Sequence, residues 1–281
     1  MPVGLADKVE VACLMGKHDT IGIDCVALCV NELLCAGARP TQVRSWVTYG
    51  KRAAHLAPAV EAGLLTGGRI AGCEVIPCPP EASSPAPADD RYLITAVAVG
   101  DQEREPVVEG VPAEGDLLIG LCASGIHADS IPLVRRMLET GRTGLDTYIS
   151  ELSHTLGEEL LRPTRVYTTA LDCLRRRGVR CKAAAHIVGG LYKSLSAIAP
   201  PGLSCQVDTS AFPVSPIFEQ MVNTGYISHN ELYQTFHMGV GMVIVISRED
   251  VGLVKDILCC GGERTYIIGS IVKGDAGVEL F

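Results

Sequence analysis

The amino-acid sequence predicts an α/β fold in two domains, and three observations carry that prediction. Segments with the two-residue period of strands alternate with segments whose apolar residues recur every three to four positions, as on a helix face. The chain has 281 residues, 47% of them hydrophobic, and this length is comfortable for two hydrophobic cores. A charged stretch with proline and glycine, residues 103–116, separates the halves. We therefore expect domains at residues 1–113 and 114–281.

The N-terminal half begins with a predicted strand at residues 1–17, where Val9 and Val11 alternate with polar or small residues. The next segment, residues 18–40, is predicted to begin with a turn, HDTIGID, and to continue as a helix that ends near Gly37. The other expected elements of this half are strands at residues 42–49, 73–78 and 91–99, a helix at residues 56–71 and a proline-rich loop at residues 77–90.

The C-terminal half continues the alternation of strands and helices. Its expected strands are residues 117–122, 183–187, 238–246 and 265–272, and its expected helices are residues 131–140, 163–177, 216–224, 230–236 and 250–259. This alternation excludes an all-α and an all-β class.

Composition excludes several classes of partner and environment. The net charge of −8 argues against nucleic acid, which needs a basic surface. No apolar run reaches the roughly 20 residues of a membrane span, and no basic segment followed by an apolar one marks a secretory signal. The 12 cysteines include no Cys-x-x-Cys pair. We expect a cytoplasmic protein with reduced cysteines that act mostly as small hydrophobes.

Polar residues gather in the helix predicted for residues 18–40. Asp19, Asp24, Asn31 and Glu32 crowd its start and middle, and Asp24 and Asn31 lie two helical turns apart on one side. Such an oxygen-rich side suits Mg²⁺. The alternative interpretation is a capped amphipathic helix with a solvated edge.

Two turns are further candidates for ligand contact. Ser124–Ser130 joins a strand to a predicted helix, a place where backbone N–H groups can receive an anion. His186 precedes Gly189 and Gly190, where the backbone can approach a ligand closely. The alternative for His186 is a hydrogen-bonded core histidine, and most capped helices bind nothing.

Several segments together resemble one family. They are HDTIGIDCVALCVNELLCAGARP, LLIGLCASGIHADSIPLVRR, LLRPTRVY, AAAHIVGGL and ELYQTFHMGVGMVIVI, in that order. The chain is identified as a member of the phosphoribosylformylglycinamidine cyclo-ligase (aminoimidazole ribonucleotide synthetase) family of purine biosynthesis. The resemblance implies an N-terminal domain that contributes to a dimer barrel and a C-terminal domain with helices on a mixed sheet. It also implies ATP, Mg²⁺, a ribonucleotide-like substrate and a homodimer.

The resemblance assigns roles to residues that match the family's motifs. The catalytic candidates are His127, Glu32 and His186, and Glu32 and Asp24 are the metal candidates. The substrate-binding candidates are Ser124, Gly125, Asp129, Gly189, Gly190 and His237, and the cofactor-binding candidates are Lys8, Asp19, Thr20, Asp24 and Asn31. The alternatives are that both catalytic histidines cap turns and that Glu32 pairs with Lys8 or Arg39.

Departures from the family pattern concentrate on the nucleotide side. Glu32 replaces an aspartate, Asp129 replaces an asparagine, and Val3 replaces the leading aspartate of D-G-V-G-T-K. Residues 77–85 differ at every position from the family's G-G-E-T-A-E-M-P-G, and we expect the family's N-terminal glycine-rich segment to be absent. The sequence therefore predicts a divergent cyclo-ligase with an altered or lost ATP side. The alternatives are an inactive paralogue acting as a structural or regulatory partner, and a paralogue recruited to an ATP-independent cyclisation or dehydration.

Overall fold

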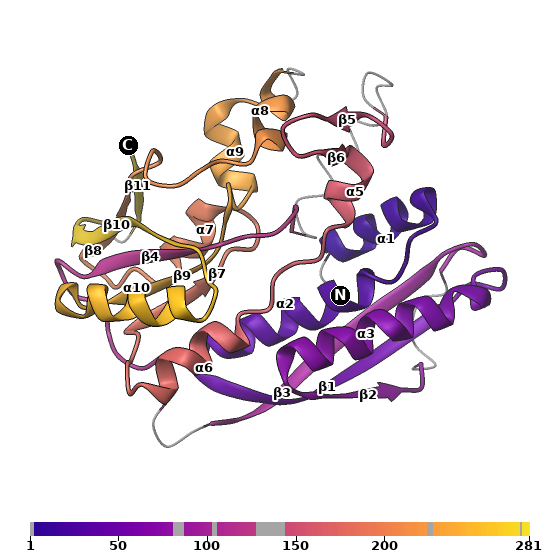
Figure 1. Cartoon of the computed structure of the whole chain (residues 1–281), viewed down its shortest axis with the longest axis horizontal. Helices are drawn as coiled ribbons and strands as arrows, with labels where there is room; N and C mark the ends of the chain where they lie inside the picture. The colour runs from indigo at the N-terminus through magenta and orange to yellow at the C-terminus, as the bar shows by residue number, and fades with distance from the viewer. Residues whose placement is uncertain (1–2, 81–86, 103–105, 128–143, 224–226, 276) are drawn as a thin grey trace. The chain divides into compact units, whose positions relative to one another are not determined.

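The computed structural model describes residues 3–80, 87–102, 106–127, 144–223, 227–275 and 277–281 (Figure 1). Contacts between residues divide the chain into two compact units. The first unit comprises Met1–Leu33, Pro40–Asp101 and Ser124–Val166, and the second comprises Leu34–Arg39, Gln102–Ala123 and Tyr167–Phe281. The first unit thus includes a segment from the second half of the sequence, and the domain boundary at residue 113 stays a prediction.

The chain begins with a helix, α1 (Val3–Met15), so the strand predicted for residues 1–17 is wrong. Leu5, Val9 and Ala12 are buried, and their spacing of four and three positions is that of one helix face. Apolar residues lie on several sides of α1, and a short alternation within such a helix imitates a strand. Over the whole of α1 the apolar residues follow the helical period, and the short alternation of valines hid that period.

The second helix, α2 (Ile21–Cys35), confirms the helix predicted for this segment. It ends before Gly37, whose φ of 78° is the left-handed conformation expected after a helix C-terminus. Helix α3 (Ala57–Ala71) packs closely against α2, because a Cβ atom on Gly22 would lie 2.1 Å from the backbone nitrogen of Leu64. Only glycine permits this approach.

A sheet of the first unit has the strand order β2-β1-β3. Its strands are β1 (Ala38–Tyr49), β2 (Glu74–Cys78) and β3 (Tyr92–Gln102), with β1 and β2 parallel. Val43 lies opposite Val75, which contacts α3, so this face is covered by helices (Figure 1). The other face carries Trp46 and Ile76, and Val97 on β3 is 55% exposed there.

The second unit contains a sheet with the order β11-β8-β10-β4-β9-β7. Its strands are β4 (Leu117–Cys122), β7 (Ala183–His186), β8 (Leu203–Val207), β9 (Val240–Ile246), β10 (Thr265–Lys273) and β11 (Val278–Leu280). β4 pairs antiparallel with β10 and β9, whereas β11 pairs parallel with β8. The mixed sheet confirms the predicted α/β class.

The helices of the second unit are α6 (Thr168–Arg176), α7 (Leu191–Ser196), α8 (Pro216–Asn223), α9 (His229–Thr235) and α10 (Val251–Cys260), with a 3₁₀ turn η3 (Arg248–Asp250). α6 packs against α10, and α7 packs against α9. α6 begins later than the predicted start at Pro163. The backbone before it is not helical, and Thr164 in this segment donates its N–H to Asp24.

The remaining elements of the first unit are η1 (Ala54–Leu56), the short strands β5 (Tyr148–Ile149) and β6 (His154–Thr155), and α5 (Leu156–Leu161). The helix predicted at residues 131–140 lies outside the described residues, as do residues 81–86 of the proline-rich loop. None of the helices in the described ranges has the length and apolar character needed to cross a bilayer.

Candidate functional site

The candidate residues form two groups, one within each compact unit, and the first centres on Asp24. Asp24 in the first turn of α2 and Lys8 on α1 are both fully buried. Lys8 Nζ lies 2.9 Å from Asp24 Oδ1 and 2.8 Å from Oδ2. Oδ1 also accepts hydrogen bonds from the backbone N–H of Thr164 at 2.9 Å and from its hydroxyl at 2.7 Å. The protein itself thus neutralises this carboxylate.

The polar residues of α2 differ in burial. Asn31 is fully buried, and its Nδ2 donates to the backbone oxygen of Arg165 at 2.8 Å, whereas Glu32 is exposed. Within the described ranges, no three His, Cys, Asp or Glu side chains are grouped so that they could hold a metal ion. The metal role assigned to Asp24 and Glu32 stays a prediction.

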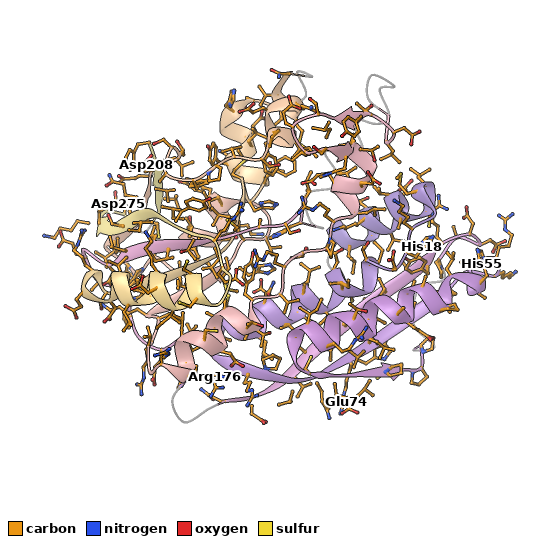
Figure 2. All side chains as sticks on the ribbon, in the orientation of Figure 1. His18, His55, Glu74, Arg176, Asp208 and Asp275 are labelled. Carbon is orange, nitrogen blue, oxygen red and sulfur yellow. The ribbon has the colours of Figure 1, made fainter. Side chains whose placement is uncertain are left out.

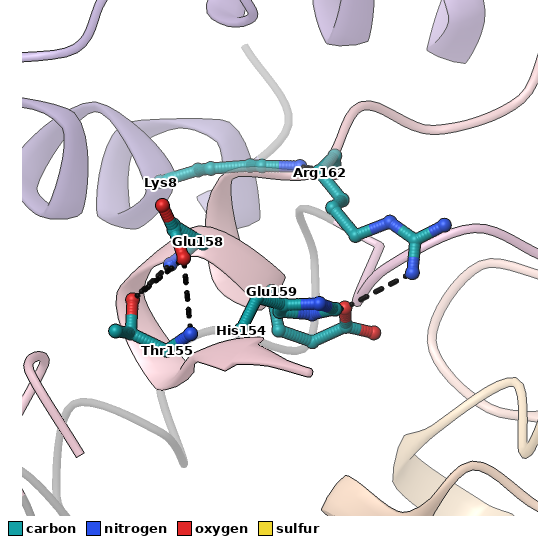
Figure 3. A network of polar contacts seen from close by, with 6 residues as sticks. All are labelled: Lys8, His154, Thr155, Glu158, Glu159 and Arg162. Atoms are coloured by element: carbon teal, nitrogen blue, oxygen red, sulfur yellow. Dashed lines mark hydrogen bonds and ion pairs between the residues drawn. The ribbon is translucent and has the colours of Figure 1, made fainter. Parts of the chain in front are cut away.

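A network of polar contacts extends from Lys8 to α5 (Figure 3). Lys8 Nζ donates to the backbone oxygen of Arg162 at 2.7 Å. Glu159 is buried, and its Oε2 lies 2.6 Å from His154 Nε2 and 3.2 Å from Arg162 Nη1. A capping box fixes the N-terminus of α5. The sequence reasoning missed His154 and Glu159, although a glutamate among the apolar residues of LGEELL signals a buried, paired carboxylate.

The turn before α2 holds His18, Asp19 and Thr20. His18 is buried, and its Nδ1 lies 3.2 Å from the hydroxyl oxygen of Tyr92 on β3. Burial lowers the pKa of His18 below its ordinary value of 6.5, and the neighbouring His55 lowers it further (Figure 2). Asp19 is exposed, and the buried Oγ1 of Thr20 has no hydrogen-bond partner among the described residues.

The Ser124–His127 segment packs against the end of α5. Gly125 has a φ of 63°, and a Cβ atom there would lie 2.7 Å from Arg162 Cβ and 2.8 Å from the Arg162 backbone oxygen. His127 is 1% exposed, so it lies inside the first unit. Asp129, the next candidate along the chain, lies outside the described residues. The structure therefore brings Gly125 together with the Lys8–Arg162 network.

The second group lies where β7 and β9 are paired. His186 ends β7 opposite Met242 of β9, and the two glycines that follow it, Gly189 and Gly190, have φ values of 70° and 96°. A Cβ atom on Gly190 would lie 2.0 Å from the backbone oxygen of Gln234. The structure thus brings together two motifs about 50 positions apart in the sequence, AAAHIVGGL and TFHMGVGM.

His237 belongs to the same group. It is 2% exposed, its Nδ1 accepts the backbone N–H of Gly239 at 3.0 Å, and its ring packs edge-on against Phe218. Met238 has a φ of 54°, a conformation that is uncommon for a residue with a side chain. A further residue that sequence reasoning missed is Tyr167, whose hydroxyl donates to the Cys122 backbone oxygen at 2.9 Å.

The cysteines of the interior are typical of structural thiols. Burial raises the pKa of Cys29 and Cys181 to about 12 and that of Cys205 to about 11. These three therefore stay protonated at neutral pH and act as small apolar side chains. Cys259 and Cys260 at the end of α10 are instead exposed.

Comparisons with known proteins match both halves of the chain. Residues 4–101 match the family model described as AIR synthase related protein, N-terminal domain, and residues 113–280 match its C-terminal domain. The phosphoribosylformylglycinamidine cyclo-ligase of Pseudothermotoga lettingae is 38% identical over 280 residues, 99% of this chain and 82% of that protein. The enzyme of the same name from Lachnospira eligens is 34% identical over 279 residues, with the same coverage.

Solved structures with the same fold are more distant in sequence. Thiamine-monophosphate kinase from Stenotrophomonas maltophilia K279a has a TM-score of 0.68 at 18% identity, covering 94% of this chain and 79% of that one. E. coli HypE, a hydrogenase maturation protein, has a TM-score of 0.62 at 19% identity, covering 92% and 76%. A structure titled AaThiL complexed with AMPPCP and TMP has a TM-score of 0.65 at 17% identity, covering 93% and 76%. These likenesses show the fold.

Proposed function

From the premise that this chain belongs to the AIR synthase related family, we propose that it catalyses ring closure on a small amide or amidine substrate. Both family models are matched, and cyclo-ligase relatives are 34% and 38% identical across 99% of the chain. The name of those relatives points to a ribonucleotide-like substrate. The proposal includes a nucleotide side that is altered relative to theirs.

Ring closure places specific demands on a site. A C–N bond forms between a substrate nitrogen and an amide carbon, and the carbonyl oxygen must leave as phosphate after phosphorylation or as water after protonation. The attacking nitrogen must also lose a proton. A neutral imidazole meets such demands because one ring nitrogen donates while the other accepts. We assign this role to His127, with His186 as a second candidate in the other unit.

The buried Lys8–Asp24 pair is the main support for a nucleotide-binding region that differs from that of the relatives. Lys8 aligns with the lysine of the family's D-G-V-G-T-K, yet both side chains have 0% exposure and lie 2.8 Å apart. A phosphate group at Lys8 or a cation at Asp24 would have to displace the partner and the two Thr164 hydrogen bonds. This arrangement supports a site in which Lys8 and Asp24 do not serve ATP.

Other observations support a retained ligand side. Gly189 and Gly190 keep positive φ values, and the turn that they form lies against the His237 segment. In the first unit, the buried Oγ1 of Thr20 has no partner among the described residues, which leaves a donor for a ligand. If the protein had lost all function, substitutions would be expected in the Gly189–Gly190 turn and in the turn that holds Thr20. A substrate-binding protein is therefore favoured over a purely structural one.

The decisive experiment separates nucleotide binding from ring closure. Calorimetry titrates the protein with AMPPCP and Mg²⁺, and a second assay follows ADP, phosphate and product with formylglycinamidine ribonucleotide and ATP. We expect weak or no nucleotide binding together with measurable substrate binding. His127→Gln should lower the product-forming rate about 10²–10⁴-fold, whereas His229→Gln, a change at an exposed position, should leave it unaltered.

Each outcome of this experiment decides between functions. Tight AMPPCP binding with substrate-dependent ADP formation would overturn the altered nucleotide side. Product formed without ADP identifies the second candidate, an ATP-independent cyclisation or dehydration, which the Lys8–Asp24 pair favours. Binding of neither ligand would overturn ring closure and leave the role of a structural or regulatory partner.

We also propose that two copies of the chain associate through the β2-β1-β3 sheet. One face of this sheet is covered by helices, whereas the other presents apolar side chains to solvent, including Val97 and Val99 with 55% and 43% exposure. A sheet with one apolar face uncovered gains stability by burying it. A homodimer is the partner that the family resemblance implies.

A further inference from the structure

The seam between α6 and α10 contains a pocket of about 320 Å³ that the proposed function does not use. Cys173 and Arg176 of α6 and Arg177 at its C-cap line the pocket, at the i, i+3 and i+4 spacing of one helix face. The lining residues from α10 and its C-cap are Leu253, Asp256, Ile257, Cys260 and Gly261. Two thiols from different helices therefore open into one small space.

Cys173 lies close to the residue that follows Cys260. A Cβ atom built on Gly261 would lie 3.4 Å from Cys173 Sγ, and Cys260 is the residue directly before Gly261. Adjacent Cα atoms are about 3.8 Å apart, and disulfides join Cα atoms about 4.4–6.8 Å apart. Cys260 is also the last residue of α10 and is exposed, so its side chain has room to turn toward Cys173.

We propose that this pocket is a thiol-modification site, at which a disulfide oxidant of the glutathione class joins Cys173 to Cys260. The thiolate of Cys260 attacks the oxidant's S–S bond and forms a mixed disulfide, and one glutathione thiol leaves. The thiolate of Cys173 then attacks the Cys260 sulfur, and the second glutathione thiol leaves. The protein loses two hydrogens, one oxidised glutathione is reduced to two thiols, and α6 becomes covalently joined to α10.

The charges of the pocket suit such an oxidant, because oxidised glutathione carries several carboxylates. Arg175 is paired with Asp172 at 3.2 Å, but in the part of the chain that the structure describes neither Arg176 nor Arg177 forms an ion pair. These two guanidinium groups line the pocket of a chain whose net charge is −8. Asp256 opposes them in part, so we expect Arg176 and Arg177 to attract the oxidant locally and in a salt-dependent way.

Cys259 provides a matched control. It neighbours Cys260 on α10 and is also exposed, but it is not among the residues that line the pocket. The two share one tryptic peptide, DILCCGGER, so a cross-linked peptide alone does not identify the sulfur. Variants of the single cysteines are therefore needed to identify which sulfur is bridged.

The test treats the full chain with oxidised glutathione, blocks the remaining thiols with iodoacetamide and maps peptides without reduction by mass spectrometry. We expect a Cys173–Cys260 bridge in the wild type and in Cys259→Ser. Cys260→Ser should lose the bridge, and adding Gly261→Cys to that variant should restore one to Cys173. Arg176→Gln with Arg177→Gln should slow bridging severalfold at low salt.

Four results would overturn the proposal. The first three are a bridge lost in Cys259→Ser but kept in Cys260→Ser, glutathione on Cys260 with no bridge, and no reaction while the restored Gly261→Cys variant does bridge. Failure of that restored variant as well would show that the two helices are too far apart, which also overturns it. None of these readouts depends on ring-closing activity.

Discussion

At the scale of single residues, the Lys8–Asp24 pair has the largest energetic consequences. Both side chains have 0% exposure, and their closest N–O distance is 2.8 Å. Removing charges from water costs several kcal/mol for each ion, and their mutual attraction offsets this only while both partners are present. Thr164 donates two hydrogen bonds to Oδ1, whereas Lys8 at 2.8 Å is the contact of Oδ2 among the described residues. The pair therefore couples α1, α2 and the segment after α5.

Lys8→Met should destabilise the protein by about 3–5 kcal/mol, because Asp24 would remain buried without its counter-ion. Urea unfolding followed by circular dichroism measures this change. Lys17→Met is the control, since Lys17 and Glu158 are 3.5 Å apart and exposed, and we expect it to cost less than about 1 kcal/mol. If the two variants lost the same free energy of unfolding, burial of the Lys8–Asp24 pair would not be the cause of the loss.

His18 should make stability depend on pH. Burial holds its folded-state pKa below the ordinary 6.5, so the unfolded chain takes up a proton first as the pH falls. The stability that His18 contributes is present above about pH 6.5 and is lost as the pH falls toward the folded-state pKa.

We expect His18→Gln to lose less stability than the wild type between about pH 7.5 and pH 5.5, as measured by urea unfolding at each pH. His229→Gln, a change at an exposed position, should retain the wild-type loss. A wild-type slope in His18→Gln would assign the pH dependence to other groups.

At the scale of elements, the turn between β7 and α7 shows how backbone geometry constrains a candidate site. Gly190 has a φ of 96° and lies against the backbone of Gln234 at the end of α9. A side chain here would meet backbone atoms, which cannot rotate away. The turn is thus defined as much by α9 as by its own glycines.

Gly190→Ala should therefore destabilise the protein by about 3 kcal/mol, the combined cost of left-handed strain and overpacking. Gly178→Ala is a comparison at a positive φ without crowding, because Gly178 has a φ of 69° but no atom within 4 Å of the added Cβ. We expect it to cost about 1 kcal/mol. Thermal unfolding of both variants compares them, and similar losses would show that crowding at Gly190 is relieved by movement of α9.

At the scale of the whole molecule, the uncovered face of the β2-β1-β3 sheet is the main unassigned surface. Trp46 on β1 and Ile76 on β2 share this face with the exposed valines of β3. A monomer would leave these apolar groups in water, and a second copy would cover them at about 25 cal/mol for each Å² buried.

Val97→Glu should shift the protein from dimer to monomer, because a carboxylate would be buried without a partner in the interface. Size-exclusion chromatography with light scattering measures the mass. Val111→Glu is the control, since Val111 is 71% exposed and lies on no strand. A mass that is the same in wild type and Val97→Glu would exclude this face as the interface.

Most of the element order was predictable from the sequence because helix and strand periods are local properties. α2, α3 and β9 follow directly from their apolar patterns, and so does the α/β class. The same local method failed at α1, where a short alternation of valines lies within a helix. It also placed the start of α6 too early, in a segment whose Thr164 backbone N–H donates to a residue 140 positions away.

The sequence by itself determined the family, through motifs whose order and content are specific. Only the tertiary structure decided that Asp24 faces Lys8, that Glu32 is exposed, and that the His186 and His237 motifs are in contact. The physical reason is that a side chain's charge and chemistry are written in the sequence, whereas its partners are set by long-range packing. A carboxylate with helical spacing is equally suited to a cation or to a lysine, and burial beside Lys8 makes that choice.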